Sequence, residues 1–286
     1  MVISKQLKND KDEQIGEESP KADFLPLNFR EVMSRRTEEP MANNAITRRM
    51  KNEVDNGKGG IALEAGVVLK MQGICMTFPG VKALEGVDLT LKKGEIRALM
   101  GENGAGKSTL IKCLTGVNKF EAGEIYLEGF DHPIVNKDTM DAQKKGISTV
   151  YQEVNLCPNL SVAENLYIGR EPLTKLGTVN RKAMNRQAAA LMKQLELDVD
   201  VTRNLEEYSL ALQQMIAIAR AVDMDCKVLI LDEPTSSLDD REVEKLFTMM
   251  RRLKEKGVGI IFVTHFLEQV YAVCDGITVL RNGQLV

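Results

Sequence analysis

The sequence has little that would bind a structural metal. It contains only two histidines, and its five cysteines form no C-x-x-C pair: Cys75, Cys113, Cys157, Cys226 and Cys274. Structural zinc sites use sets of Cys and His at short spacings, so no such site is expected. An odd number of widely spaced cysteines predicts reduced thiols in a cytoplasmic compartment rather than a disulfide framework.

Long apolar runs are also missing. No run approaches the roughly 18 residues that a membrane-spanning helix needs. The first residues, "MVISKQLKNDKDEQ", are polar and lack the apolar segment of a secretory signal peptide. We therefore expect any membrane association to come through a separate subunit.

The chain has no strong excess of charge of either sign. Its 38 Lys and Arg against 41 Asp and Glu give a net charge of −3, which predicts no nucleic-acid partner. A hydrophobic fraction of 43 % and a charged fraction of 28 % are typical of a soluble globular protein. With 286 residues, the chain can form one large α/β domain or two modest ones.

The first part of the chain differs from the rest. Residues 1–65 mix charges of both signs with Asn, Pro and Gly, show no sustained period, and close on the linker-like "EVDNGKGG". This composition predicts a poorly ordered N-terminal extension or linker over 1–65, followed by a folded domain over 66–286. Met41 and Met50 offer later translation starts, and "NFREVMSRR" allows a short docking helix.

The second part alternates between strand-like and helical patterns. Short β-type runs such as "VVLKMQGI" and "EIRALMG" come first, and helical patterns dominate from about residue 163 to 224. Two strongly apolar runs, "KVLILDEP" and "VGIIFVTH", then flank an amphipathic helix that ends at a glycine. The alternation predicts an α/β fold with a parallel sheet.

The sharpest local signal is "ALMGENGAGKSTLIKCL". It matches G-x-x-x-x-G-K-[ST], follows an apolar strand and opens an apolar-periodic helix, which is the context that the motif requires. Glycines let the backbone wrap closely around a phosphate, and the N–H groups of the helix start point at the anion. The segment therefore predicts a nucleotide site with these contacts: Gly101, Glu102, Asn103, Gly104, Ala105, Gly106, Lys107, Ser108 and Thr109. Lys107 is predicted to reach the β- and γ-phosphates, and the Ser108 hydroxyl to ligate Mg²⁺.

"VLILDEPTSSLDD" supplies a second part of such a site. Its apolar run predicts a buried strand that delivers Asp232 and Glu233 at its carboxyl end. Asp232 is predicted to hold Mg²⁺ through water, and Glu233 to polarise the attacking water as a general base.

Two further polar residues follow strand-like runs. His265 ends "GIIFVTH", and a strand beside that of Asp232 would bring its imidazole near the γ-phosphate. Gln152 in "TVYQEVN" would bring its carbonyl to the metal and the water. Each residue alone is more often structural, and the phosphate loop gives them their functional interpretation.

In combination these segments resemble the ATP-binding-cassette (ABC) ATPases over about residues 67–286. The Walker A loop is "GENGAGKST", the Q-loop lies at Gln152, Walker B is "VLILDE", the D-loop is "SSLD" and the H-loop lies at His265. Phe78 in "FPGVKAL" matches the aromatic residue that stacks on adenine in this family. The resemblance implies a P-loop NTPase cassette that binds ATP and Mg²⁺, with Asp239 of the D-loop also contacting nucleotide. The implied fold is a RecA-like core with an antiparallel β subdomain and a helical signature subdomain at about 153–222.

Within the family, the segments "VYQEVNLCPNLSVAENLYIGREP" and "VTHFLEQVYAVCDGITVLRNG" are similar to monosaccharide importers, above all the galactofuranose type. This similarity implies an ATPase subunit on the cytoplasmic face of the inner membrane, attached peripherally to permease subunits that serve a periplasmic sugar-binding protein. Such relatives usually fuse two cassettes. The resemblance therefore implies either a half-length subunit that pairs with a second cassette, or a truncated reading frame.

The family signature L-S-G-G-Q has one candidate here, "YSLAL" at residues 208–212, in which only Ser209 matches. The resemblance implies that Ser209 and the helix start face ATP held by the partner cassette. Leu212 replaces the glutamine and lies on the apolar stripe Leu212, Met215, Ile216, Ala219 and Val222. Leu210 points roughly opposite that stripe.

Two other functions remain open from the sequence. One is a soluble ABC protein of another class, such as a translation factor or a DNA-repair ATPase. The long coiled-coil insertion of repair members and the charged linker of translation factors are both absent from this sequence. The other is a nucleotide-binding fragment without turnover.

Overall fold

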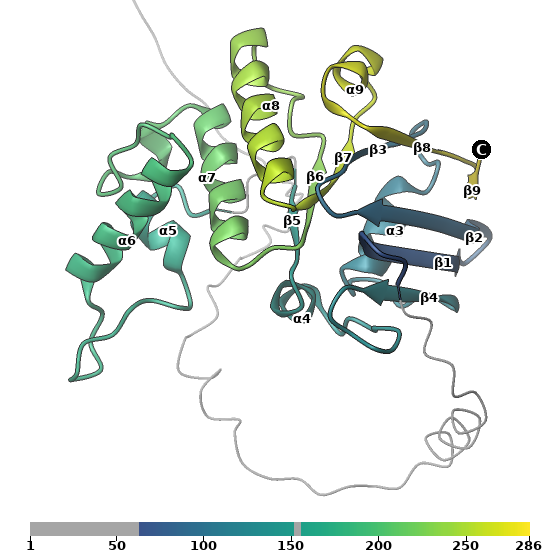
Figure 1. Cartoon of the computed structure of the whole chain (residues 1–286), viewed down its shortest axis with the longest axis horizontal. Coiled ribbons are helices and arrows are strands. Elements are labelled where there is room, and N and C mark those ends of the chain that lie inside the picture. Colours follow the sequence, from purple (N-terminus) through teal and green to yellow (C-terminus); the bar gives the residue numbers. More distant parts are fainter. Residues whose placement is uncertain (1–62, 152–155) are drawn as a thin grey trace, which may run out of the picture. The chain divides into compact units, whose positions relative to one another are not determined.

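The computed structural model of the chain describes residues 63–151 and 156–286 (Figure 1). The predicted N-terminal extension lies almost wholly outside the described residues, as does Gln152. In the part that the structure describes, two β-sheets and a group of helices are built from strongly apolar strands and amphipathic helices.

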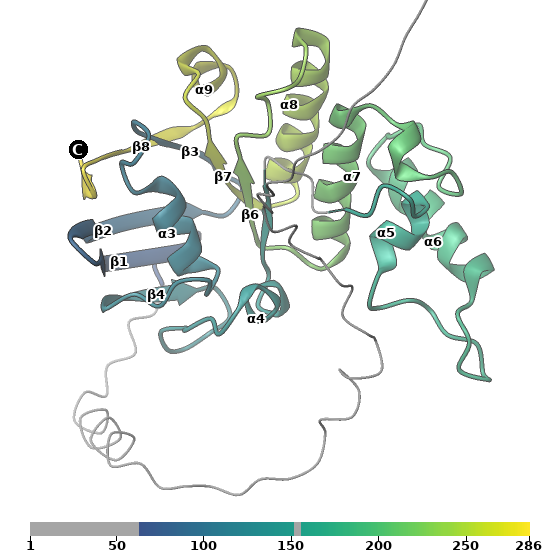
Figure 2. The same ribbon diagram turned by 180° about the vertical axis from the view of Figure 1, so that it is seen from behind.

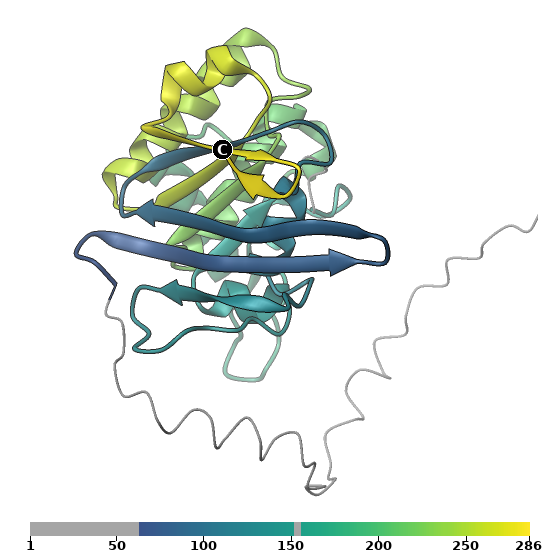
Figure 3. The ribbon, with the colours of Figure 1, turned by 90° about the vertical axis from the view of Figure 1, so that its right-hand side faces the viewer.

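The first sheet is antiparallel, with the strand order β2-β1-β4. It contains β1 (Val67–Phe78), β2 (Val81–Lys92) and β4 (Ala122–Leu127). On β2, Val87, Leu89 and Leu91 are buried while the residues between them are more exposed, which is the period of two expected for a sheet with one covered face. Figure 3 shows β1 and β2 as two long neighbouring strands.

The second sheet has the order β5-β6-β7-β3-β8-β9 and is parallel except for the β8–β9 hairpin. Its strands are β3 (Ile96–Met100), β5 (Ile147–Val150), β6 (Val228–Asp232), β7 (Gly259–Val263), β8 (Gly276–Arg281) and β9 (Gln284–Leu285). Every residue of β7 is buried, because helices and the other sheet cover both faces. The neighbouring strands β6, β7 and β3 end at the same edge, which is where loops carry binding groups in α/β folds.

The helices fall into two groups by position. Helices α3 (Lys107–Leu114), α4 (Thr139–Lys144), α8 (Asp240–Glu255) and α9 (Leu267–Val273) connect strands of the two sheets. The other helices pack together beside the larger sheet (Figures 1 and 2). They are α5 (Val162–Tyr167), α6 (Arg181–Gln194), the short 3₁₀ helix η2 (Leu205–Glu207) and α7 (Leu210–Asp223). The predicted fold class, a parallel-sheet core with an antiparallel β part and a helical part, is confirmed.

The predicted apolar stripe of α7 is narrower than the face that the fold buries. Met215, Ile216 and Ala219 are buried as expected, whereas Leu212 and Val222 are half-buried at the edges of the same core cluster. Ala211, Gln214 and Ile218 are also buried, because α7 packs against α5 and β5 as well as α8. Leu210 lies outside this face with 41 % exposure, as predicted.

All five cysteines carry free thiols in the structure. Burial raises the pKa of Cys113 and Cys226 to about 11 and that of Cys274 to about 12, so these thiols stay protonated near neutral pH. No helix in the described ranges is long and apolar enough to cross a bilayer.

Candidate nucleotide-binding site

The phosphate loop runs from the end of β3 to the start of α3. Gly101, Gly104 and Gly106 adopt φ angles of 148°, 82° and 108°, a region that L side chains rarely occupy. A Cβ on Gly106 would lie 2.8 Å from the carbonyl oxygen of Ala83, so both the dihedral and the neighbouring backbone require glycine. The loop thereby turns sharply and presents the free N–H groups of the α3 start toward the space above it.

Lys107 is the first residue of α3 and is held inside the loop. Its Nζ donates hydrogen bonds to the carbonyl oxygens of Gly101 at 2.6 Å and Glu102 at 3.0 Å. The residue is only 7 % exposed, although no carboxylate forms an ion pair with it among the described residues. An ammonium group has three N–H donors, so one remains for a phosphate while the two carbonyl oxygens hold the side chain in place.

Asp232 and Glu233 stand side by side at the carboxyl end of β6. Burial raises the pKa of Asp232, the adjacent Glu233 raises it further, and Lys107 and Lys112 partly oppose both effects. Glu233 has a φ of 47°, and its backbone N–H donates to the carbonyl oxygen of Val263 at 3.0 Å. A non-glycine residue in this conformation costs free energy, and such strain is typical of functional positions.

One hollow of about 370 Å³ brings the two motifs together. Lys107, Ser108, Asp232 and Glu233 all line it, as does the loop from Asn103 to Gly106. The lining also includes residues that sequence reasoning missed: Val81, Lys82 and Ala83 at the start of β2, and Asn282 between β8 and β9. No local motif marks these four, because they reach the site only through the packing of the antiparallel sheet and the β8–β9 turn against the loop.

The strand that precedes His265, β7, lies beside the strand of Asp232, as the sequence predicts. β7 pairs with β6 in parallel register, with Asp232 opposite Val263. His265 therefore follows directly beside the carboxylate pair, and its Nδ1 is 3.6 Å from Oε1 of Glu233. The imidazole is exposed and packs against the ring of Phe266 with centroids 4.0 Å apart.

A hydrogen-bond network that sequence reasoning missed fixes these two strand ends. Oε1 of Gln269 on α9 accepts from the Thr235 hydroxyl at 2.8 Å and from the Thr264 hydroxyl at 3.2 Å. The Thr264 oxygen in turn accepts from the N–H of Phe266 at 3.1 Å. One amide oxygen thus links the segment after Glu233 to the segment that carries His265.

Five predicted nucleotide contacts lie outside the lining of this hollow: Gly101, Glu102, Phe78, Asp239 and Ser209. Gly101 and Glu102 instead supply the carbonyl oxygens that hold Lys107. Phe78 is 39 % exposed at the end of β1, where it pairs with Val81. Asp239 caps α8 by accepting from the N–H of Glu242 at 2.8 Å. Ser209 caps α7 by accepting from the N–H of Leu212 at 3.4 Å. These positions are compatible with contacts to a nucleotide or a partner, and their binding roles stay predictions.

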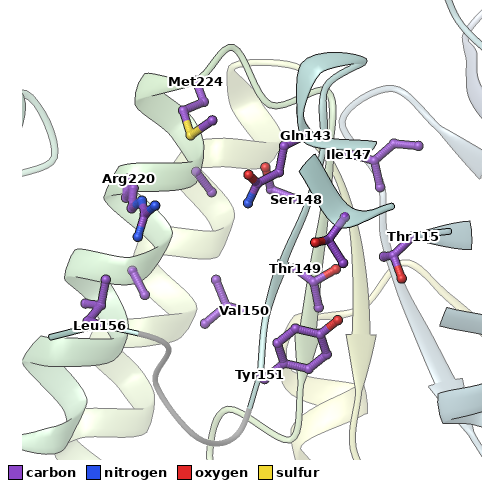
Figure 4. Close-up of a pocket in the computed structure, with 13 residues that line it drawn as sticks. Thr115, Gln143, Ile147, Ser148, Thr149, Val150, Tyr151, Leu156, Arg220 and Met224 are labelled. Atoms are coloured by element: carbon purple, nitrogen blue, oxygen red, sulfur yellow. The ribbon is translucent and has the colours of Figure 1, made fainter. Parts of the chain in front are cut away.

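A second hollow, of about 290 Å³, lies between β5 and α7 (Figure 4). Arg220 of α7 and Met224, which follows that helix, line one side, and Ser148 to Tyr151 line the other. Gln152 follows Tyr151 directly, but the prediction that it reaches the metal falls outside the described residues. This hollow contains none of the residues predicted for the phosphate or the metal.

The described residues contain no group of three or more His, Cys, Asp or Glu side chains that could hold a metal by itself. Mg²⁺ usually retains waters and binds through one or two protein oxygens together with substrate phosphates. Ser108 and Asp232, which line the same hollow, fit that kind of site. The adjacent Glu233 raises the pKa of Asp232, and a cation bound there would offset this repulsion between the two carboxyl groups.

The family model described as "ABC transporter" matches residues 84–236, a range that contains the phosphate loop and the Asp232–Glu233 pair. The chain belongs to the ABC transporter family. The resemblance predicted from the six motifs is therefore confirmed, and neither alternative class of function gains support.

Curated relatives include sugar importers. The galactofuranose transporter ATP-binding protein YtfR of Escherichia coli K12 is 58 % identical over 219 residues, which cover 77 % of this chain and 43 % of the relative. The fructose import ATP-binding protein FruK of Bifidobacterium longum is 53 % identical over 220 residues, or 77 % of this chain and 42 % of the relative. The chain thus spans less than half the length of these relatives.

Solved structures of isolated cassettes match over more of their length. An ATP-binding cassette of an ABC transporter in its ADP conformation superposes with a TM-score of 0.68 at 28 % identity, covering 77 % of this chain and 89 % of that one. A dimeric cassette in a post-hydrolysis state, bound to ADP and phosphate, has a TM-score of 0.63 at 26 % identity, covering 76 % and 96 %. These likenesses confirm the cassette fold.

Proposed function

We propose that this chain is an ATP-hydrolysing cassette that energises a bacterial importer of a monosaccharide. The observation that carries the proposal is the single hollow in which the phosphate loop meets Asp232 and Glu233, with His265 beside them. The relatives named as galactofuranose and fructose import ATP-binding proteins support the sugar class. The permease subunits, the periplasmic binding protein and the cytoplasmic face of the inner membrane belong to the same proposal.

Each group of the hollow has a distinct chemical task in this proposal. The loop N–H groups and Lys107 bind the phosphates, while Glu233 accepts the proton of the attacking water. His265, within reach of Glu233, holds the water and the transferred phosphate in line. Ser108, Asp232 and Gln152 would hold Mg²⁺, which when bound offsets the charge of the phosphates.

ATP hydrolysis in this proposal needs two cassettes. The dimeric solved relative with ADP and phosphate supports a paired arrangement. The start of α7, capped by Ser209 and with Leu210 exposed, would face the nucleotide of the second cassette, whether that is another copy or a second half. The helix start keeps its N–H groups, but Leu212 lacks the amide of the family signature, which predicts an asymmetric pair of sites.

The replacement Leu212→Gln tests this asymmetry. Leu212 is half-buried against the core rather than aimed at this chain's own phosphate loop, so restoring the amide should change ATP turnover by only about twofold to threefold. The measurement is steady-state ATP hydrolysis by the complex assembled with the chain's membrane subunits. A loss as large as that of a Glu233 variant would contradict the asymmetric pair.

Gln269→Leu tests whether the amide that links the two strand ends positions Glu233 and His265. The change leaves two buried hydroxyls without their acceptor, and the shift of His265 should lower kcat about tenfold with little change in KM for ATP. Gln269→Glu keeps an oxygen that accepts both bonds and should restore most of kcat. Equal kcat values for the Leu and Glu variants would refute the positioning role, and the adjacent exposed Glu268→Gln serves as a control.

The proposed function itself is tested by phosphate release from ATP with and without the membrane subunits. Stimulation by those subunits supports an energising cassette, and transport of a sugar in reconstituted vesicles identifies the substrate. An assembled complex that binds ATP but releases no phosphate would refute the proposal and indicate a nucleotide-binding fragment instead.

A further inference from the structure

The segment from Pro172 to Leu195 carries a charge bias that the nucleotide site does not use. Its five charged side chains are all basic: Lys175, Arg181, Lys182, Arg186 and Lys193. The whole chain, by contrast, has a net charge of −3. The segment comprises a β-hairpin after α5 and the whole of α6, so the bias belongs to two adjacent elements.

On α6 the basic residues form a stripe. Arg186 and Lys193 follow Lys182 by four and eleven residues, which places all three along one side of a helix with 3.6 residues per turn. All three are exposed, while Met184, Ala188 and Leu191 bury the opposite side. Like charges four residues apart destabilise a helix, and cations in the first turn oppose its dipole. Lys193 lies in the last turn and complements the dipole, so helix stability accounts for that residue but not for Lys182 and Arg186.

Nearby carboxylates do not neutralise this stripe. Glu164 approaches Arg181 at 3.7 Å, and Glu196 pairs with Arg252 on α8 at 2.6 Å. Within the described ranges, no ion pair involves Lys175 or the three stripe residues. The positive charges of Lys175 and the stripe therefore remain available to an anionic partner outside the molecule.

The hairpin adds an exposed apolar tip. Leu176 is 90 % exposed, and Leu173 and Val179, which form a β-bridge, are 63 % and 46 % exposed. Backbone hydrogen bonds hold this shape, from Thr174 N–H to the Thr178 oxygen at 2.7 Å and from Asn180 N–H to the Pro172 oxygen at 2.7 Å. Figures 1 and 2 show the connection between α5 and α6 projecting beyond both helices. An ordered tip with an exposed leucine beside lysine is typical of a surface that inserts at a lipid headgroup boundary.

We infer that this basic hairpin–helix face, defined by Lys175, Leu176, Lys182, Arg186 and Lys193, binds directly to an anionic membrane surface. The basic side chains attract the headgroups, and Leu176 enters the boundary between headgroups and acyl chains. An RNA or DNA ligand would use the stripe but leave the apolar tip without a role, so the tip favours lipid. The contact would help to orient the cassette under the membrane independently of ATP turnover.

Co-sedimentation of the full chain with vesicles tests the inference without permease or ATP. The vesicles contain phosphatidylglycerol and phosphatidylcholine in equal parts, or phosphatidylcholine alone. We expect binding to the anionic vesicles at about 0.1 M salt and loss of binding at about 1 M salt, where the Debye length is about 3 Å. The triple change Lys182→Gln, Arg186→Gln and Lys193→Gln should weaken binding about 100-fold, from about fivefold for each charge. Leu176→Ser should weaken it about tenfold.

The matched control changes three exposed lysines elsewhere, Lys119→Gln, Lys144→Gln and Lys256→Gln, and so removes the same charge. Its vesicle binding should stay within about twofold of that of the unaltered chain. Circular dichroism of each variant shows whether α6 remains folded. Equal losses in the control and the stripe variant would overturn the inference, as would binding to neutral vesicles with the same affinity. RNA binding through the stripe without vesicle binding would also overturn the inference. The vesicle experiment contains no ATP, so its outcome does not depend on whether the chain hydrolyses ATP.

Discussion

Replacing Glu233 by glutamine should lower ATP turnover by about 10³-fold while leaving ATP binding nearly unchanged. The amide has the size of the carboxylate but cannot accept a proton from water. Glu233 lines the same hollow as Lys107 and Ser108, and its carboxylate lies 3.6 Å from His265. The measurement is phosphate release by the assembled complex, together with the affinity of the chain for a fluorescent ATP analogue.

Glu268→Gln is the matched control for this experiment. It removes one negative charge from an exposed position on α9, three residues after His265, without touching the hollow. Its turnover should stay within about twofold of that of the unaltered chain. A Glu233→Gln protein that hydrolyses ATP at the normal rate would show that another group takes the proton.

The change Gly106→Ala should cost about 3 kcal/mol in the free energy of unfolding and abolish measurable nucleotide binding. Gly106 has a φ of 108°, and a Cβ there would lie 2.8 Å from the Ala83 oxygen and 2.9 Å from a Leu84 methyl carbon. The phosphate loop could accept the methyl group only by moving away from β2, which would misdirect its N–H groups. Urea unfolding and nucleotide titration measure the two effects.

Gly66→Ala separates strain in the dihedral angle from the clash. Gly66 also has a positive φ, 86°, but a Cβ at this position would have no other atom within 4 Å, and the residue is remote in sequence from the loop. We expect a loss of about 1 kcal/mol in stability and no change in nucleotide affinity. If the two alanine variants were equally stable and both bound nucleotide, close packing at Gly106 would not be what shapes the loop.

Local sequence patterns were sufficient for the parts of the site that each come from one continuous segment. The spacing from Gly101 to Ser108 specifies a strand–loop–helix unit, because glycine conformations and the helix start are properties of neighbouring residues. The apolar run before Asp232 and Glu233 predicts their place at a strand end for the same reason. Periodicity also located α8 and most of the buried side of α7.

Contacts between distant segments could not be predicted in this way. Lys82 and Asn282 line the hollow between the phosphate loop and the acidic pair only because the β2 start and the β8–β9 turn pack against the loop. Gln269 lies in an ordinary amphipathic helix, and no local pattern indicates that its amide oxygen accepts bonds from Thr235 and Thr264. The width of the buried side of α7 depends on helices α5 and α8 and strand β5, which the pattern of α7 alone does not reveal.

The sequence by itself therefore determined the family, the phosphate loop and the identity of the acidic pair, since each rests on the chemistry of adjacent residues. Tertiary structure alone decided which side chains meet around the hollow and how far His265 lies from Glu233, because those distances depend on the order of β6, β7 and β3 in the sheet. It also decided that the basic residues of α6 are exposed along one stripe beside an apolar tip. Exposure is set by what the rest of the chain covers, and no single segment encodes it.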